Sequence, residues 1–485
     1  MRIYCADLET TVYEGQTETE AWSSALVAMD EDEPVVHHSL EETLEYLNSR
    51  SEDAVLYYHN LKFDGNFWLS YLITKLGFKQ GLIDIGNGKY EWKDVKKIEN
   101  NEVIYSISSM GQWYSITFKY RSHKYILRDS LKLLPFKLSE IGEAFKTTHR
   151  KLDMEYTGYR YAGCDITPKE MEYIKNDVLV LKEALQIMFA DGHNKLTIGA
   201  CCLAEYRKMI GKYDWDLFFP HLHEIEIDPE TYGSCTADEY IRNSYHGGWC
   251  YLVEGASGKT YKKGTTADVN SLYPSMMHSE SGNVYPLGRP SFWKGSDIPR
   301  QAQLPNRYYF IRIRCRFYLK EGKLPFIQIK SNPRYKATEM LKTSDIYDKR
   351  TKKYYKKYRD SNNEIQDTKV TMTMTCVDYK LFLEHYDTEE LEILDGCWFY
   401  ADKGIFDRYI DKYKEIKMRE KGAKRTEAKL FLNNLYGKLG ANDCSSFKIA
   451  YLREDNSLGY KTMEAYDKRV GYIPCGSAIT SYARN

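Results

Sequence analysis

Four acidic side chains in three distant stretches constrain the fold of this chain more than any other feature. Asp7 and Glu9 lie in "YCADLET", Asp64 in "HNLKFDGNF" and Asp177 in "YIKND". Any one of them alone is most simply a surface charge. Together they form the pattern D-x-E, N-x-x-x-D and Y-x-x-x-D. That pattern favours one shared site. Carboxylates that meet there would repel each other unless a cation lay between them, so the site is expected to bind metal ions.

Such a convergence of acids suits phosphodiester hydrolysis. Two Mg²⁺ ions about 3.5 to 4 Å apart can stabilise both the attacking water and the leaving oxygen. Asp7 and Glu9 stand two apart on a predicted strand, so both side chains leave the same face. Tyr173 precedes Asp177 by one helical turn, shares its face and can orient the water. The chain is therefore predicted to bring a strand and two helices together around a metal-dependent nuclease site.

The segments around these acids predict a mixed sheet with helices. Hydrophobic patterning indicates strands at residues 2–10, 54–60, 103–107 and 113–120. It also indicates a helix at residues 63–76. Asp64 would begin that helix. A second helix over 167–186 is signalled by Thr167 as N-cap, Pro168 at the first position and Glu170 to complete a capping box.

A second group of motifs lies later in the chain. The stretch "TTADVNSLYPSMM", residues 265–277, places Asp268 at the end of a short strand-like run. "KLFLNNLYGKLG" supplies Lys429, Asn433 and Tyr436 at helical spacings of four and three, so they share a helix face. A lysine can neutralise a triphosphate and a tyrosine can stack on a base. An amphipathic helix with an ordinary polar stripe gives the same pattern.

Glycine and charge patterns add three weaker signals. "SYHGGW", residues 244–249, allows close backbone approach to a phosphate chain, although a tight turn explains it equally. Strands are expected over 306–319 and 323–330, and the basic, tyrosine-rich run 347–363 suits either a solvated hairpin or loop or contact with a nucleic-acid backbone. Residues 403–438 predict two helices broken near Gly422.

Composition excludes several classes of protein. The 69 basic and 69 acidic residues balance, so no whole-chain basic signature is present and any polyanion site must be local. The 11 cysteines include no CxxC pair, which argues against a zinc site and a disulfide framework and favours a reduced cytosol. No secretory h-region and no run of about 18 apolar residues occur, so neither secretion nor membrane contact is expected.

The first group of motifs resembles the three exonuclease motifs of family B DNA polymerases. "YYHNLKFDGNF" and "YIKND" resemble those of the protein-primed branch found in bacteriophages. The resemblance implies that Asp7, Glu9, Asp64 and Asp177 hold two Mg²⁺ or Mn²⁺ ions, assisted by Tyr173 and by Lys151 in "FKTTHRKLDMEY". It also implies contacts to the single-stranded 3′ end of DNA from Thr10, His59, Asn60, Phe67, Ser130 and Leu131.

The second group resembles polymerase motifs A and B and the YxGG motif of the same branch. By that resemblance Asp268 and the Val269 carbonyl hold the two metal ions of the transfer site, and Tyr245, Gly247 and Gly248 contact DNA. Tyr273 would exclude a ribose 2′-hydroxyl. The implied deoxynucleoside triphosphate contacts are Ser271, Leu272, Lys417 and Lys429, and Asn433 and Tyr436 would position the nascent base pair.

The resemblance runs over all 485 residues and implies a mixed α/β fold in six segments. A ribonuclease H-like 3′–5′ exonuclease domain, 1–198, is followed by a first palm part, 199–280, with YxGG and motif A. The later segments are a first insertion that contacts a priming terminal protein (281–400), fingers with motif B (401–440), a second insertion for strand displacement (441–468) and the start of a second, truncated palm part (469–485).

Asp268 lacks the partner that the resemblance requires. The family carries a second catalytic aspartate in a motif C of the form Y-x-D-T-D, and no DTD occurs in this sequence. The chain is thus expected to be truncated before motif C and the thumb, and it should not extend a primer alone at a useful rate. A second polypeptide or a missing C-terminus would supply the rest.

The leading hypothesis is the exonuclease-bearing part of a protein-primed replicative DNA polymerase, acting on primer-template DNA in the cytoplasm of a bacterial host. Two alternatives stay open. One is a stand-alone 3′–5′ DNA exonuclease that retains a degenerate polymerase body. The other is a non-catalytic subunit that binds terminal protein.

Overall fold

The computed structural model describes residues 1–154, 159–329, 332, 334–336, 338–441, 446–465 and 471–485. The chain folds into two compact units. The first unit comprises Met1–Ala204, Glu415–Phe431 and Asn442–Arg469, and the second comprises Glu205–Lys414, Leu432–Ala441 and Val470–Asn485. Three helices carry residues of both: α5 (Ile198–Ile210), α11 (Asp407–Arg419) and α12 (Ala423–Leu439).

The first unit is built on an eight-stranded mixed sheet with the order β3-β2-β1-β4-β10-β9-β8-β5. Strands β1, β4 and β10 run parallel at its centre, and β2 and β9 flank them in antiparallel pairing. The strands are β1 (Arg2–Thr10), β2 (Ala21–Ala28), β3 (Val35–His37), β4 (Ala54–Tyr58), β5 (Lys79–Gln80), β8 (Glu102–Ile107), β9 (Trp113–Tyr120) and β10 (His123–Asp129). The predicted strands over 2–10, 54–60, 103–107 and 113–120 are confirmed.

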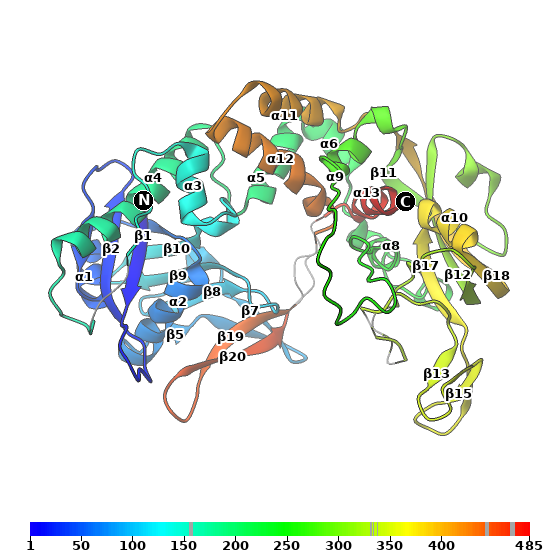
Figure 1. The fold of residues 1–485 in the computed structure, drawn as a ribbon, viewed down its shortest axis with the longest axis horizontal. Coiled ribbons are helices and arrows are strands. Elements are labelled where there is room, and N and C mark those ends of the chain that lie inside the picture. The colour runs from blue at the N-terminus through cyan, green and yellow to red at the C-terminus, as the bar shows by residue number, and fades with distance from the viewer. Residues whose placement is uncertain (155–158, 330–331, 333, 337, 442–445, 466–470) are drawn as a thin grey trace. The chain divides into compact units, whose positions relative to one another are not determined.

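Side chains along β1 alternate between the two faces of the sheet. Tyr4, Ala6 and Leu8 join a core that also holds residues of α1 (Leu40–Ser49) and α2 (Leu61–Ser70). The intervening positions, among them Asp7 and Glu9, leave the opposite face. Helix α4 (Pro168–Ala190) packs on β1 and β2, as Figure 1 shows. The sheet therefore presents its acids on the side away from the aromatic core.

Helix α4 begins as the sequence predicts. Thr167 is the N-cap, Pro168 lies in the first turn, and Thr167 and Glu170 form a reciprocal capping box. The Thr167 amide donates to Glu170 Oε2 at 2.9 Å, and the Glu170 amide donates to Thr167 Oγ1 at 3.3 Å. Helix α3 (Leu138–Phe145), a π-helical turn (Tyr71–Lys75) and two 3-10 turns, η2 (Val95–Lys97) and η3 (Ser130–Lys132), complete this part.

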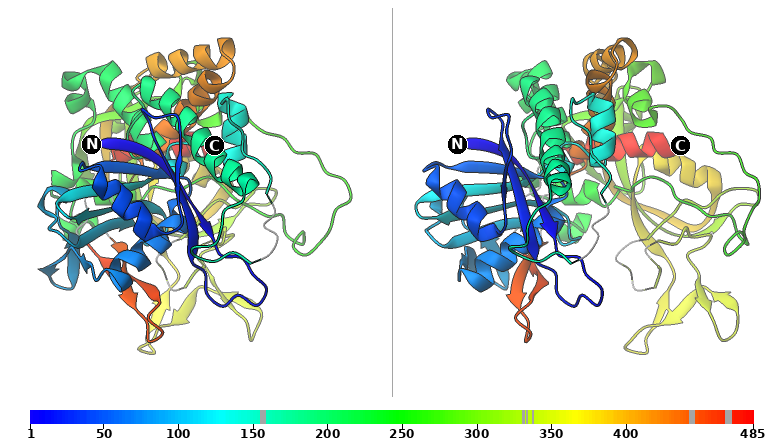
Figure 2. Two further views of the ribbon diagram at one scale, coloured as in Figure 1. Left: turned by 90° about the vertical axis from the view of Figure 1, so that its left-hand side faces the viewer. Right: turned by 60° about the vertical axis from the view of Figure 1, so that its left-hand side comes forward.

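A hairpin from late in the sequence forms part of the first unit. Strands β19 (Ser446–Leu452) and β20 (Leu458–Glu464) extend a small sheet with β7 (Lys89–Trp92) and β6 (Leu82–Gly86) in the order β19-β20-β7-β6. Gln80 Nε2 donates to the Ala450 carbonyl at 2.9 Å, and the Tyr460 hydroxyl donates to Asn66 Oδ1 at 2.8 Å. Figure 2 shows this hairpin in orange-red. Within the predicted segment 441–468, residues 442–445 and 466–468 lie outside the described residues.

The second unit is centred on a four-stranded antiparallel sheet with the order β11-β18-β12-β17. Its strands are β11 (Tyr285–Lys294), β12 (Arg307–Leu319), β17 (Val370–Thr375) and β18 (Tyr386–Asp402). Its helices are α6 (Lys212–Phe218), α7 (Pro229–Tyr232), α8 (Ala237–Arg242), α9 (Leu272–Met277), α10 (Cys376–His385) and α13 (Ile473–Arg484), with 3-10 turns η4 (Leu222–Glu224), η5 (Ser279–Ser281) and η6 (Arg300–Gln303). The predicted strand over 306–319 is confirmed as β12.

The strand predicted over 323–330 is wrong for the residues that are described, since only an isolated bridge joins Ile327 to Leu341. The amides of Phe326 and Ile327 donate instead to the Tyr386 hydroxyl, at 2.9 and 3.4 Å. Pro325 has no amide hydrogen to offer a sheet. The Tyr386 hydroxyl thus accepts the hydrogen bonds that a neighbouring strand would otherwise accept. Lys330 lies outside the described residues.

The basic run 347–363 forms two short hairpins, one from β13 (Ile346–Asp348) and β14 (Lys353–Tyr355), the other from β15 (Lys357–Arg359) and β16 (Ile365–Asp367). The hairpin interpretation is therefore confirmed. The two helices predicted over 403–438 are confirmed as α11 and α12, and Gly422 between them has φ +60°, which favours glycine. Among the described residues, no helix is long and apolar enough to cross a membrane.

Candidate active sites

The predicted acid cluster forms where β1 meets α4 in the first unit. One carboxylate oxygen from each of Asp7, Glu9 and Asp177 lies within 4.8 Å of the other two. Asp7 pairs with Ala25 and Glu9 with Ser23 across β1 and β2, so the D-x-E spacing keeps both on one face. Asp177 thus shares one small volume with two acids that lie about 170 positions earlier in the sequence.

Asp64 lies beside this group in the first turn of α2 and is 2% exposed. Burial raises the pKa of Asp64 to about 8, although a hydrogen bond from the Leu8 backbone lowers it. Gly65 lets the helix approach closely, because a Cβ there would lie 2.9 Å from the Trp113 ring. Burial, and then the charges of Asp64, Glu9 and Asp177, raise the pKa of Asp7 well above its usual range.

Two oxygens of the acid cluster have no protein partner. Asp64 Oδ1 and Asp177 Oδ1 are buried and form no hydrogen bond with any residue that the structure describes. Buried carboxylate oxygens are costly unless they are paired or bound to a metal. A donor set made only of carboxylate oxygens suits hard cations such as Mg²⁺ and Mn²⁺. The four acids therefore fit the two divalent ions that the sequence predicts.

Lys151 and Tyr173 complete the cluster. The Lys151 ammonium forms an ion pair with Asp177 and donates to the Tyr173 hydroxyl at 2.9 Å. It also lies 4.6 Å from the centre of the Tyr173 ring. Burial raises the pKa of Asp177 although Lys151 lowers it. The structure thus brings the least specific of the sequence predictions, Lys151, into direct contact with the acids.

Two loops next to the cluster hold four of the predicted DNA contacts. His59 Nδ1 lies 3.0 Å from Ser130 Oγ, and His59 Nε2 lies 2.8 Å from the Phe136 carbonyl oxygen. Burial lowers the pKa of His59. Asn60 adopts φ +72° as the N-cap of α2, and Leu131 lies in the short turn η3 that starts at Ser130.

Asp129 organises both loops and was missed by the sequence analysis. Its Oδ1 accepts hydrogen bonds from the amides of Asn60 at 3.1 Å, Leu61 at 3.2 Å and Leu131 at 3.1 Å. The side chain is 2% exposed. Its position directly before the turn "SLK" was the available signal, because aspartate readily caps such turns.

Thr10 and Phe67 lie at the borders of the same region. Thr10 ends β1, just beyond a shift in the β1–β2 register, and its carbonyl accepts a hydrogen bond from Trp22 Nε1 at 3.0 Å. Phe67 packs edge-on against Phe63 with ring centres 5.5 Å apart. Phe63 is 47% exposed and offers a ring for stacking that the sequence analysis did not select.

The polymerase-type motifs converge on three tyrosines in the second unit. The rings of Tyr273 and Tyr436 stack with centres 3.9 Å apart and planes 13° apart. The Tyr245 ring lies 3.1 Å from the position of a Cβ on Gly440, so a side chain at that position would crowd the ring. Gly248 faces the Tyr273 hydroxyl, which lies 3.6 Å from the corresponding Cβ position. Burial, followed by the effects of Tyr273 and Tyr245, raises the pKa of Tyr436 to about 12.

Asp268 does not end a strand, so that expectation is wrong. Residues 261–270 are exposed and contain no strand, and Figure 2 shows this segment as part of an extended green loop. Val269, the one large apolar residue of "TTADV", is 62% exposed, so the run lacks an apolar face that a sheet would bury. Among the described residues, no group with metal-ligand geometry includes Asp268.

The other predicted nucleotide contacts lie on or next to helices α9, α11 and α12. Ser271 has φ +53° and is the N-cap of α9, whose first residues are Leu272 and Tyr273. Lys417 lies on α11, while the exposed Lys429 and Asn433 lie on α12, which also carries Tyr436. Lys417 and Lys429 belong to the first unit and Asn433 to the second.

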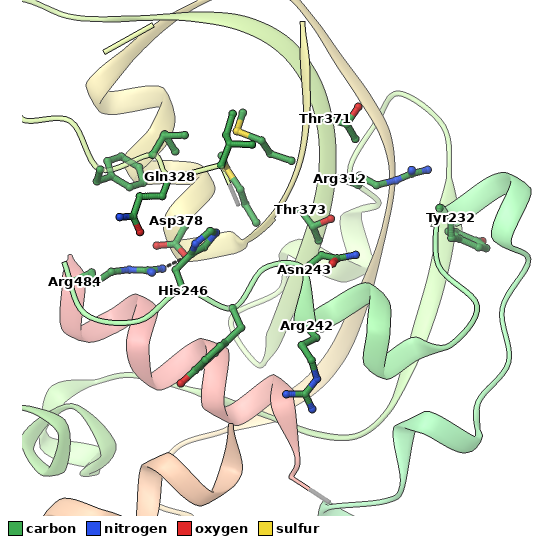
Figure 3. Close-up of a pocket in the computed structure, with 17 residues that line it drawn as sticks. Tyr232, Arg242, Asn243, His246, Arg312, Gln328, Thr371, Thr373, Asp378 and Arg484 are labelled. Carbon is green, nitrogen blue, oxygen red and sulfur yellow. Dashed lines mark hydrogen bonds and ion pairs between the residues drawn. The ribbon is translucent and has the colours of Figure 1, made fainter. Parts of the chain in front are cut away.

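A polar cavity of about 380 Å³ lies next to the YxGG segment, as Figure 3 shows. Tyr245 and His246 contribute to its wall, but Asp268 does not. Its three arginines already pair with acids, Arg242 with Asp238, Arg312 with Asp395 and Arg484 with Asp378. The cavity is therefore separate from the predicted metal ligand of the transfer site.

Comparison with known proteins places these motifs in a family. A family model described as "DNA polymerase type B, organellar and viral" matches residues 46–163 and 159–485. The chain belongs to this polymerase family. The predicted resemblance to the family B polymerases of bacteriophages is thereby confirmed. Relatives include the DNA polymerases of Bacillus phages Nf and phi29, each 34% identical over 100% of this chain and over 76% and 75% of their own length.

Solved structures agree with the family assignment. The phi29 DNA polymerase complexed with primer-template DNA and incoming nucleotides is similar with a TM-score of 0.79 and 33% identity, over 100% of this chain and 76% of that one. The same polymerase complexed with single-stranded DNA gives a TM-score of 0.77 and 32% identity, over 100% and 75%. The predicted mixed α/β fold of this DNA-directed DNA polymerase is thereby confirmed. Members of the family generally use divalent metal ions and deoxynucleoside triphosphates.

Proposed function

We propose that the first unit is a proofreading exonuclease that removes nucleotides from the 3′ end of single-stranded DNA. The observation that carries the proposal is the convergence of Asp7, Glu9 and Asp177 from β1 and α4, with orphaned oxygens on Asp64 and Asp177. Their donor chemistry suits two Mg²⁺ or Mn²⁺ ions. The similar phi29 polymerase complexed with single-stranded DNA supports the choice of substrate.

Bound ions would activate a water and stabilise the oxygen that leaves the phosphorus. The Tyr173 hydroxyl would form a hydrogen bond with that water. Lys151 donates to this hydroxyl and pairs with Asp177, which holds the hydroxyl beside the acids. Lys151 also adds a positive charge near the developing negative charge of the phosphate. Asp129 fixes the loops of His59, Asn60 and Ser130, which would orient the 3′-terminal nucleotides. Phe67 would stack on a base.

Digestion of 5′-labelled single-stranded DNA tests this proposal. The chain should shorten the strand from its 3′ end in Mg²⁺ or Mn²⁺. Asp7→Ala and Asp64→Ala should each slow shortening by more than about 1000-fold, because each removes a metal ligand. Glu14→Ala, which changes an exposed acid outside the cluster, is the matched control. Undiminished digestion by Asp7→Ala would show that the site lies elsewhere.

We also propose that the second unit binds primer-template DNA and an incoming nucleotide through its tyrosines and Asp268. The stack of Tyr273 and Tyr436 beside Tyr245 supports this, because flat rings can position a base pair and exclude a 2′-hydroxyl. Two-metal transfer needs a further carboxylate near Asp268. We propose that a segment of the form Y-x-D-T-D, carried on a second polypeptide or on further sequence of the same protein, supplies it.

Adding such a polypeptide should restore primer extension with all four deoxynucleotides. Asp268→Asn should abolish the restored extension and leave the exonuclease unchanged, because the two sites use different acids. If the mixture binds but never extends a matched primer, the stand-alone exonuclease becomes the better account. By the family resemblance, the segment 281–400 would contact a terminal protein and the hairpin of β19 and β20 would assist strand displacement.

A further inference from the structure

A second group of metal-ligand residues lies in the first unit, away from the nuclease acids. Asp191 is the C-cap of α4, His193 follows it by two residues, and Glu427 lies in the second turn of α12. One carboxylate oxygen of each acid and one ring nitrogen of His193 all lie within 4.8 Å of one another. The proposed exonuclease and transfer reactions use none of these three side chains.

Glu427 is buried, which is unusual for an acidic side chain. It is 4% exposed and occupies a buried face of α12, beside Ala428 and Phe431, which are 1% and 0% exposed. Its Oε1 is buried and forms no hydrogen bond with any described residue. A buried carboxylate oxygen without a partner is costly. Because the same side chain belongs to a group of potential ligands, this unpartnered oxygen indicates that Glu427 lacks a binding partner in the metal-free chain.

Among the described residues, the Lys424 ammonium is the cation that the structure pairs with both carboxylates of this group. Lys424 forms an ion pair with Asp191, and its Nζ lies 3.9 Å from Glu427 Oε2. His193 packs against Phe431 with ring centres 4.4 Å apart, which fixes the plane of the imidazole. Burial, followed by a hydrogen bond to Asp191, raises the pKa of Glu427 to about 8.

We propose that Asp191, His193 and Glu427 bind one divalent transition-metal ion, with Zn²⁺ as the best fit, and thereby fasten the end of α4 to the start of α12. Imidazole nitrogens and carboxylate oxygens both bind Zn²⁺, and three protein ligands leave the fourth position of a tetrahedral site to water. An imidazole is a poor ligand for Mg²⁺, so the site should select against the ion that suits the nuclease acids. The absence of CxxC pairs does not bear on a site without cysteine.

Binding of Zn²⁺ would free Lys424 from its ion pair with Asp191. The ion then supplies the positive charge that the lysine supplies in its absence. Affinity should rise with pH, because the proton competes with the ion. Removal of the Lys424 charge should strengthen binding, because an ammonium group beside the site repels a cation.

Calorimetric titration of the full chain with Zn²⁺ tests the proposal. The chain should first carry Asp7→Asn and Glu9→Gln, which remove two of the four nuclease acids and so weaken that competing site. One Zn²⁺ should then bind per chain. His193→Gln and Glu427→Gln should each weaken binding on the order of 100-fold or more. Lys424→Gln should strengthen it. Glu415→Gln, which removes an exposed carboxylate on α11, should leave it unchanged.

Substitution of Co²⁺ for Zn²⁺ gives an independent readout. Absorption bands of a four-coordinate Co²⁺ site should appear in the control chain and disappear in His193→Gln, which changes a partly exposed loop residue and should leave the fold intact. Failure of Zn²⁺ to bind, or binding that survives both His193→Gln and Glu427→Gln, would overturn the proposal. In that case Asp191 and Glu427 simply share a proton beside Lys424.

Discussion

Burial raises the pKa of Asp64 in the acid cluster, so the stability of the fold should depend on pH. Burial raises the pKa of Asp64 from its ordinary value of 3.8 to about 8, so the folded chain keeps a proton that the unfolded chain has lost. The stabilising effect of that proton is complete below the ordinary value and disappears as the pH rises toward about 8. Mg²⁺ would take the place of the proton. It should therefore raise the melting temperature more at about pH 8 than at about pH 5. Thermal denaturation with equal Mg²⁺ shifts at both values would argue against an acid-bound ion.

Lys151 is a cation in direct contact with the acids of the proposed nuclease site. Its pKa lies above the usual range, because the charge and hydrogen bond of Asp177 outweigh the opposing effect of burial. Lys151→Ala leaves Asp177 buried without its cation and removes the donor to Tyr173, so the rate of 3′ cleavage should fall about 100-fold or more. Single-turnover kinetics measures the effect. Lys169→Ala, which changes an exposed lysine on α4, should cleave at the original rate, and equal losses in both variants would remove the specific role of Lys151.

At the scale of elements, the late hairpin depends on a few polar anchors. The Tyr460 hydroxyl donates to Asn66 and its ring lies edge-on to Trp113, with ring centres 5.6 Å apart. Tyr460→Phe keeps the ring and removes the hydrogen bond, which should cost about 1 kcal/mol of local stability. Hydrogen exchange should therefore quicken in β19 and β20 and stay unchanged in β4. Unchanged exchange in the hairpin would show that ring packing alone anchors it.

Elements set by local chemistry could be predicted from the sequence. The alternation of β1 placed Asp7 and Glu9 on one face, and the capping box of Thr167 and Glu170 marked the start of α4. Elements that depend on distant partners could not. The segment near Ile327 bonds to Tyr386, and Asp268 lies in a loop although its neighbours resemble a strand. Asp129 was missed because its role depends on amides about 70 positions earlier in the chain.

For the whole molecule, the balance of 69 basic and 69 acidic residues makes DNA binding a property of local surfaces. Lysines and arginines at such a surface release counterions from the strand, so affinity for single-stranded DNA should fall about tenfold or more between roughly 50 and 200 mM salt. Fluorescence anisotropy measures this dependence. An uncharged methylphosphonate strand should bind weakly at every salt concentration. A dissociation constant that is flat for the natural strand would contradict a cationic DNA groove.

The central claim is that β1, α2 and α4 together build a two-metal nuclease site. Anomalous diffraction from crystals grown with Mn²⁺ and a short single-stranded DNA tests it most directly. We expect two peaks about 3.5 to 4 Å apart, with oxygens of Asp7, Glu9, Asp64 and Asp177 as the protein ligands. The Asp64 and Asp177 oxygens that lack partners should be among the ligands. Crystals that bind Mn²⁺ elsewhere and show no peak between these four acids would contradict the account.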